Sequence, residues 1–336
     1  MLAPVGYTAK SSVRRRWALL LRALLGTAAV VFVCSRFQVW DRLQSLSSSI
    51  HAEFVLSGLL ATVCLIAVRA HRWNMIVGAC GENLSLAELV RVYGASFFLG
   101  LVSPGKIGEL MRIWSVRDRV GGISTATFTV AFDRIFDLAP TLMLTAAFGV
   151  VSGYGGTVNR GIVVGGAGIL AVGSVILLCH PAWLWRQVER LSGRLLKRLH
   201  ARGSITSPDA VDSAAPRLGR GLIASALALS AFSQILALGQ VYLFACALGL
   251  ELNPLMIYAV VTVATVVASL PLSIAGFGTR EIAVVLALTS LGVSNEDAVS
   301  FSLLWLGNFV AMLGLSFVAF LADSMTPVTS QLRNES

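Results

Sequence analysis

Charged residues are scarce in this sequence. Only 13% of its 336 residues are Asp, Glu, Lys or Arg, about half of the share in a soluble domain, whereas 56% are hydrophobic. A soluble globule of this size cannot hide so much apolar surface, so the composition excludes a water-soluble enzyme and a disordered chain. The apolar segments are continuous rather than alternating, which excludes a transmembrane β-barrel. We therefore expect an all-α polytopic membrane protein.

Several chemical signatures are also missing. The five cysteines form no CxxC pair, and the four histidines lack the spacing of a metal site. The sequence has neither a GxxxxGK[ST] phosphate loop nor a visible Ser/His/Asp grouping. It therefore predicts no cofactor, no metal and no enzymatic activity. The net charge of +9 is typical of the excess of Lys and Arg on the cytoplasmic side of membrane proteins, so we expect no nucleic-acid partner.

The hydropathy predicts about six spanning helices, because each needs roughly 20 mostly apolar residues. They are residues 17–35, 54–68, 138–159, 161–185, 221–250 and 298–322. Two further apolar stretches, 92–105 and 252–279, are interrupted by Pro and Gly, which weaken a helix. We interpret them as two oppositely oriented re-entrant hairpins, the second returning through residues 281–293.

The basic residues are distributed unevenly over this topology. With a cytoplasmic N-terminus, 20 of the 26 Lys and Arg residues lie on the cytoplasmic side and three on the other. This asymmetry places both termini in the cytoplasm, in a single domain of the inner membrane covering residues 1–336. A basic loop, 180–220, separates the first half (1–179) from the second half (221–322), and 323–336 is a tail. The loop is either a clamp for anionic lipid head groups or a plain cytoplasmic loop.

The two interrupted stretches resemble each other, as in an inverted repeat. Each contains a Leu, a Ser, two nearby glycines, a basic residue and a Glu, and Gly108 lies 170 residues before Gly278. Matched interruptions in two halves are the best sequence indication of a transporter's binding site, although small residues also simply allow close helix packing. The candidates are Pro104, Gly105, Gly108, Glu109 and Arg112 in the first stretch, and Ser273, Gly276, Gly278, Arg280 and Glu281 in the second. For Glu109 and Arg112 we favour solvated charges at the membrane interface.

A third group of charges, Asp133, Arg134 and Asp137, stands at the start of an otherwise apolar helix. The two carboxylates are four residues apart and so share one face. Charges at membrane depth are costly, which makes them candidates for function. Arg134 either contacts a lipid phosphate or belongs to a local interfacial cluster. Arg280 and Glu281 form either a gating pair beside a lipid path or a structural ion pair with another charge such as Asp137.

These motifs follow one order along the chain: Arg69-Ala70-His71-Arg72-Trp73, then 103–112, then Asp133-Arg134 with Asp137, then 270–281. In this order, over roughly residues 69–322, the sequence resembles the transmembrane region of lysylphosphatidylglycerol synthases and the wider family of flippase-like integral membrane proteins. The resemblance implies an inner-membrane protein that moves lipids between leaflets, and it adds Arg72 to the expected substrate-binding residues.

Two departures from the family pattern limit what the resemblance implies. Only 14 residues follow Ala322, so we do not expect the aminoacyl transfer that full-length synthases owe to a soluble domain. Many relatives have an arginine in the last helix, where this chain has Trp305-Leu306-Gly307-Asn308. We therefore expect no head-group contact from an arginine of that helix.

The sequence thus favours a lipid translocase for an anionic or glycosylated lipid, energised by a gradient or passive. The expected partners are membrane lipids, anionic or polyprenyl-linked. One alternative is a non-transporting membrane partner of a cell-envelope lipid or glycan synthase. Another, which the short outer loops disfavour, is a membrane-embedded glycosyltransferase. No oligomeric state is predicted.

The topology can be tested by labelling single cysteines from outside the cell. Since the basic residues place 180–220 in the cytoplasm and 36–53 outside, Ser47→Cys should react with an impermeant thiol reagent and Ser204→Cys should not. Labelling of Ser204→Cys in intact cells would contradict the predicted orientation.

Overall fold

A computed structural model of the chain describes residues 50–103, 107–151, 157–201, 216, 218–269 and 279–325. Within these ranges every regular element is a helix. The elements are α3 (Ala52–Cys80), α4 (Leu86–Val102), the short 3-10 helix η1 (Ile107–Leu110), α5 (Met111–Val116), α6 (Ile123–Val151), α7 (Thr157–Cys179), α8 (Pro181–Ala201), α9 (Arg220–Ala247), α10 (Pro254–Ser269), α11 (Thr279–Ser290) and α12 (Asn295–Met325). The expected all-α architecture is confirmed.

Three of these helices, α3, α9 and α12, are long and apolar enough to cross a membrane. A fourth candidate span is the bent pair formed by Gly168–Cys179 and Pro181–Arg194. The predicted first span, 17–35, lies outside the described residues. The structure therefore supports a multi-pass membrane protein.

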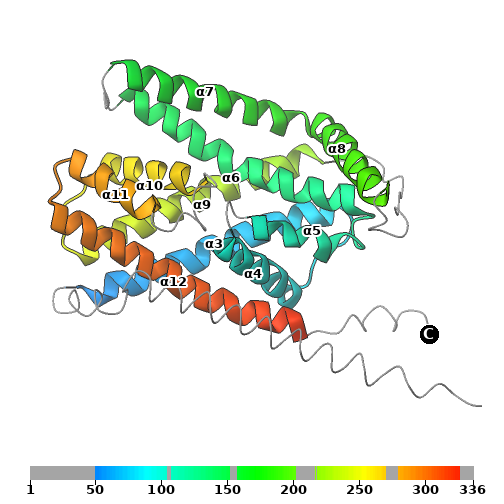
Figure 1. The fold of residues 1–336 in the computed structure, drawn as a ribbon, viewed down its shortest axis with the longest axis horizontal. Helices are drawn as coiled ribbons and strands as arrows, with labels where there is room; N and C mark the ends of the chain where they lie inside the picture. The colour runs from blue at the N-terminus through cyan, green and yellow to red at the C-terminus, as the bar shows by residue number, and fades with distance from the viewer. Residues whose placement is uncertain are drawn as a thin grey trace, which may run out of the picture.

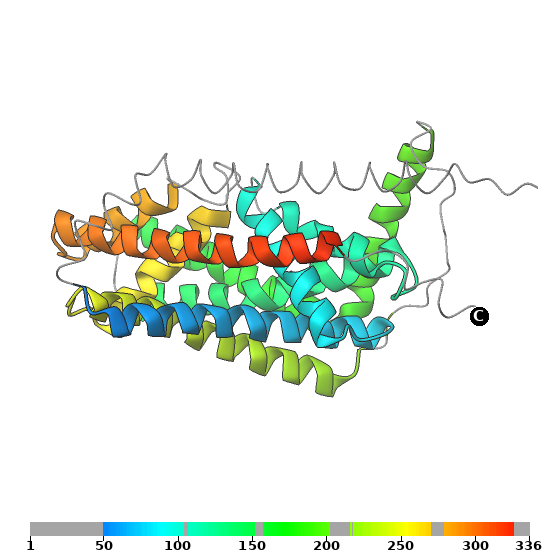
Figure 2. The same ribbon diagram turned by 90° about the horizontal axis from the view of Figure 1, so that it is seen from below.

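The long helices α3, α6, α9 and α12 run along the length of the bundle (Figure 1). α10 and α11 lie in one half of the bundle, whereas α4 and α5 lie nearer to the half that holds α8. Figure 2 shows that α3 and α12 lie along the long axis of the bundle. The chain thus places the described parts of its two interrupted stretches in different halves of the bundle.

Local hydrogen bonds define the start of α4 and the turn that follows it. Ser85 and Glu88 form a capping box that starts α4, and the helix ends at Val102. The backbone N–H of Gly108 then donates to the Oγ of Ser103 at 2.7 Å. A Cβ at Gly108 would lie 2.2 Å from the carbonyl oxygen of Leu99, so only glycine lets η1 approach α4 this closely.

An ion pair ties the start of α4 to the connection between α5 and α6. Arg119 Nη2 lies 2.5 Å from Glu88 Oε1. Partial burial raises the pKa of Glu88, but the hydrogen bonds from Ser85 and the charge of Arg119 outweigh it and hold that pKa below its usual range. The carboxylate is therefore ionised at neutral pH and keeps both contacts.

The expected second span, 54–68, is too short. Helix α3 continues to Cys80, so Arg69 and Arg72 lie inside a continuous helix and not in a cytoplasmic loop. The helix can continue because the guanidinium of Arg72 is buried against carboxylates, which removes the need to end the apolar segment before it. Neither arginine therefore reports which side of the membrane the following residues occupy.

The expected fourth span, 161–185, is also wrong at its end, because the chain bends by 94° between α7 and α8. The bend falls at His180-Pro181, where proline disfavours helical backbone in the preceding residue. Helix α8 takes up the first part of the predicted loop 180–220. It packs on α6 through Trp185, which meets Phe128 edge-on, and through a 2.7 Å hydrogen bond between Ser192 and Ser124.

The contact between α3 and α9 offers a test of the packing. A Cβ at Gly58 would lie 2.4 Å from the ring of Phe244, which is fully buried. We expect Gly58→Ala to destabilise the protein by about 1–3 kcal/mol, because the ring has no room to withdraw. Gly173→Ala in α7, where a Cβ meets nothing within 4 Å, is the matched control.

The measurement is the midpoint of thermal denaturation in detergent, followed by the loss of the monodisperse chromatographic peak. Phe244→Leu in the Gly58→Ala background should restore part of the lost stability. Equal midpoints for Gly58→Ala and Gly173→Ala would contradict the predicted close contact.

Candidate functional site

A buried network of charges joins α3, α6 and α9. Arg72 donates from Nε and Nη2 to Asp133 Oδ1 at 2.9 and 2.8 Å, and from Nη2 to Asp137 Oδ1 at 2.7 Å. Its Nη1 donates to the Oγ of Ser230 at 2.8 Å. The side chains of Arg72 and Asp133 are both fully buried. Arg72 thus has a partner for each nitrogen, as a guanidinium in an apolar interior requires.

Arg112 completes this network from the far side. Its Nη1 donates to Asp133 Oδ2 at 3.2 Å and its Nη2 to Glu109 Oε2 at 3.3 Å. The guanidinium also lies 4.8 Å from the ring centroid of Tyr93 and 5.1 Å from that of Trp73. Each oxygen of Asp133 therefore binds a different arginine.

The expectation that Glu109 and Arg112 are solvated charges is wrong, because both side chains are buried. The same segment exposes its apolar residues instead, namely Ile107, Leu110, Met111 and Trp114. Spacing of three and four residues places these on one helical face and Glu109 and Arg112 on the other. The apolar face points outward and the charges point into the bundle, which is the arrangement that a surrounding lipid phase favours.

Arg134 and Asp137 extend the network from its fully buried part to a more exposed side. Arg134 pairs with Glu109, and its Nη1 lies 3.5 Å from Asp137 Oδ2. Asp137 also lies 3.5 Å from Arg69 Nε. The expectation that this group stands at the start of a helix is wrong, since α6 begins at Ile123 and the charges lie well inside it. The helix starts earlier because the residues from Ile123 to Phe132 are uncharged, being apolar apart from one Ser and three Thr.

The charges of the network do not cancel. Four guanidinium groups, those of Arg69, Arg72, Arg112 and Arg134, meet three carboxylates, those of Glu109, Asp133 and Asp137. The difference is one positive charge in a largely dehydrated region, where it attracts an anion strongly. In the described part of the chain, no group of three or more His, Cys, Asp or Glu side chains is placed to hold a metal ion.

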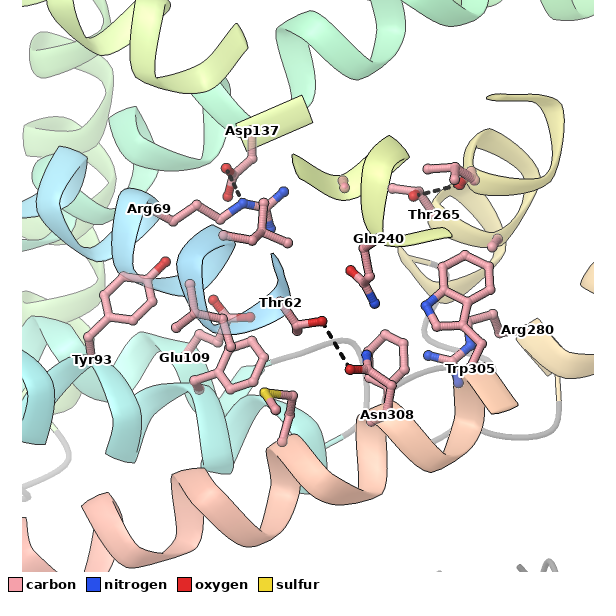
Figure 3. A pocket seen from close by; sticks show the side chains of 18 of the residues that line it. Thr62, Arg69, Tyr93, Glu109, Asp137, Gln240, Thr265, Arg280, Trp305 and Asn308 are labelled. Atoms are coloured by element: carbon pink, nitrogen blue, oxygen red, sulfur yellow. Dashed lines mark hydrogen bonds and ion pairs between the residues drawn. The ribbon is translucent and has the colours of Figure 1, made fainter. Parts of the chain in front are cut away.

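A cavity of about 170 Å³ opens beside this network and is lined by residues from helices of both halves of the chain (Figure 3). Its charged lining residues are Arg69, Glu109, Arg134, Asp137 and Arg280. Figure 3 shows Arg69 and Asp137 on one side and Arg280 with Trp305 on the other. Thr62, Gln240 and Asn308 lie between these sides. Polar side chains therefore line the cavity from one side to the other.

The far side of the cavity is formed around Arg280. Its guanidinium pairs with Glu281, and it lies 3.7 Å from the ring centroid of Phe309 and 5.6 Å from that of Trp305. The alternative that Asp137 is its partner is wrong, because Asp137 pairs with Arg69, Arg72 and Arg134. Arg280 thus adds to the lining a guanidinium that is paired with Glu281 and packed on aromatic rings.

The structure sorts the predicted site residues into three groups. Glu109, Arg134, Asp137 and Arg280 line the cavity. Arg72, Arg112 and Asp133 are fully buried in the network, Gly108 packs η1 on α4, and Glu281 pairs with Arg280. Pro104, Gly105, Ser273, Gly276 and Gly278 lie outside the described residues.

Sequence reasoning missed the neutral polar residues of the lining. Asn308 accepts a 2.9 Å hydrogen bond from Thr62, which joins α12 to α3 across the cavity wall. Gln240 stands in the charge-free run 221–250. A side-chain amide in an otherwise apolar membrane helix is itself a signal, because such groups face the bundle interior. Arg69 belongs to the Arg69–Trp73 motif, but its position just after the predicted span 54–68 indicates a cytoplasmic loop rather than a cavity lining.

The comparisons with known proteins agree with the resemblance drawn from the motifs. A family model described as the lysylphosphatidylglycerol synthase TM region matches residues 19–316. The match covers most of the chain and confirms that resemblance. No curated protein matches the sequence.

Asp133 is expected to be essential for folding. Asp133→Asn leaves Arg72 and Arg112 buried with one carboxylate fewer, and breaking a buried ion pair on one side costs roughly 3–5 kcal/mol. We expect a large fall in the yield of monodisperse protein after extraction in mild detergent. Asp118→Asn, which removes an exposed carboxylate paired with Arg117, is the matched control and should change little. Equal yields of the two variants would contradict the structural role.

Proposed function

We propose that this chain, which belongs to the family of the lysylphosphatidylglycerol synthase TM region, is a translocase that moves an anionic lipid between the leaflets of the inner membrane. The observation that carries the proposal is the cavity with an excess of positive charge, reached by residues of both halves of the chain. The family supports a lipid as the substrate, and the charge supports a phosphate in its head group.

In this proposal six helices span the membrane and the two interrupted stretches are re-entrant hairpins. α4, η1 and α5 enter from the cytoplasmic side, and α10 and α11 enter from the outside. Their location in different halves of the bundle supports this topology (Figure 1). Broken helices at membrane depth need protein or a wet cavity around their backbone, and both stretches contribute to the cavity lining. The excess of basic residues on one side of the predicted topology supports cytoplasmic termini in this proposal.

Arg134 is the group we assign to the lipid phosphate. Its side chain is 34% exposed, whereas Arg72 and Arg112 are fully buried and fully engaged within the network. A guanidinium offers two parallel N–H donors, which suits the non-bridging oxygens of a phosphodiester. The head group would occupy the cavity while the acyl chains stay in the bilayer.

The remaining lining residues provide the path. Gln240, Asn308 and Thr62 offer neutral hydrogen-bonding groups between the two charged sides of the cavity (Figure 3). On the far side, Arg280 offers a further guanidinium, which is paired with Glu281. No covalent step is needed for such a transfer, so we propose a transporter rather than an enzyme, driven by a gradient or running passively.

Transport can be measured with the purified protein in phospholipid vesicles that contain a fluorescent phosphatidylglycerol. The wild type should exchange this lipid between leaflets faster than protein-free vesicles do. We expect Arg134→Gln to lower the rate by at least about tenfold, because a charge-assisted hydrogen bond contributes about 1.5–3 kcal/mol. The variant should fold, since Glu109 keeps Arg112 and Asp137 keeps Arg69 and Arg72.

Arg119→Gln is the matched control, because Arg119 pairs with Glu88 outside the cavity. It should retain the wild-type rate. A wild type that is no faster than empty vesicles, for several lipid classes and with an imposed gradient, would refute translocation and favour a non-transporting partner of an envelope synthase.

A further inference from the structure

We infer that Glu109 is a built-in competitor for the lipid phosphate: its carboxylate occupies Arg134 while the cavity holds no lipid, gives way to the phosphate, and returns to release it. The inference rests on the proposed function and concerns the same cavity. It assigns to Glu109 the control of affinity and release.

The position of Glu109 between two unequal arginines is the first step. Arg112 is fully buried and held in place by Asp133 and by the rings of Tyr93 and Trp73. Arg134, by contrast, is 34% exposed and lines the cavity. Glu109 contacts both. Because Arg112 stays fixed, Glu109 can leave Arg134 and still keep a cationic partner.

The second step is the chemical equivalence of the two anions. A carboxylate and a phosphodiester each carry one negative charge and offer two oxygens to the fork of a guanidinium. Lipid binding therefore exchanges one anion for another on Arg134. The exchange avoids a state in which Arg134 faces the cavity without its closest carboxylate, which would be costly in a medium of low dielectric constant.

The third step is the room that the fold leaves for Glu109. A Cβ at Gly100 in α4 would lie 2.5 Å from Glu109 Cγ and 3.1 Å from its Oε1. The absent side chain is therefore what lets the Glu109 carboxylate lie against α4 and reach its present position. A methyl group at residue 100 would displace the carboxylate without changing any charge.

A competitor has opposite effects on binding and on release. Without it, the lipid phosphate meets an Arg134 that pairs only with Asp137 and binds more tightly, but the carboxylate of residue 109 no longer replaces the phosphate when the lipid has to leave. A purely structural Glu109 would instead support the site, and its removal would weaken binding and slow transport together. The two roles therefore differ in the sign of the change in affinity.

The experiment compares Glu109→Gln, Gly100→Ala and the control Gly173→Ala with the wild type. Binding is measured in detergent with dihexanoyl phosphatidylglycerol as the probe, from the concentration that gives half of the maximal thermal stabilisation. Transport is measured in vesicles from the maximal rate and the half-saturating mole fraction of a fluorescent phosphatidylglycerol. Glu109→Gln should fold, because Arg112 keeps Asp133 and Arg134 keeps Asp137.

For Glu109→Gln we expect half-saturation at about tenfold lower lipid, together with a lower maximal rate, since a charge-assisted hydrogen bond no longer competes. Gly100→Ala should shift both quantities in the same directions with the charge of the cavity unchanged, and Gly173→Ala should shift neither. Unchanged or weaker binding by Glu109→Gln would overturn the inference, as would a Gly100→Ala variant that behaves like Gly173→Ala. Absence of transport in the wild type would refute the proposed function instead, and the binding arm would still decide whether Glu109 competes for the anion.

Discussion

The bridge that Asp133 forms between Arg72 and Arg112 is the interaction on which the rest of the site depends. One carboxylate oxygen accepts from α3 and the other from α5, so a single side chain holds three helices together. Each arginine is fully buried and could not stay there alone, because an isolated charge in an apolar interior is expensive. The bridge makes burial of both arginines possible, and with it the continuous helix α3 and the inward position of α5.

The network contains two kinds of charged residue: fully buried ones that hold the helices together, and others that line the cavity. Arg72 and Arg112 have their donors engaged and their surfaces covered, which makes them part of the scaffold. Arg134 and Glu109 lie one contact further out, at the cavity. Because the inner layer is fixed, a change at Glu109 or Arg134 need not disturb the helices behind them. Residues of the same types therefore stabilise the fold in the inner layer and, in the proposed function, bind the lipid at the cavity.

The neutral wall of the cavity depends on close helix contacts elsewhere. Gly58 brings α3 against Phe244 of α9, and the hydrogen bond from Thr62 to Asn308 joins α3 to α12 one turn further on. Both α9 and α12 thereby place an amide, Gln240 and Asn308, beside the charged residues of α3 and α6. An arginine is absent from this part of α12, and Arg280 of α11 supplies a cation against its aromatic residues instead.

The amino-acid sequence by itself determined the class of protein, the helical architecture and the family, because hydropathy and motif order are properties of the chain read in one dimension. It also marked Asp133, Arg134 and Asp137 as costly charges at membrane depth, and Glu109 and Arg280 as candidates beside the two interrupted stretches. It could not decide where helices end or which charges are buried: α3 runs past Arg72, the chain bends at His180-Pro181, and Arg112 points inward. Those outcomes depend on partners far away in sequence, since a charge remains in an apolar environment only when an opposite charge from another helix reaches it. Only the tertiary structure brings those partners together, and it alone decided that one arginine is sealed inside while another faces the cavity.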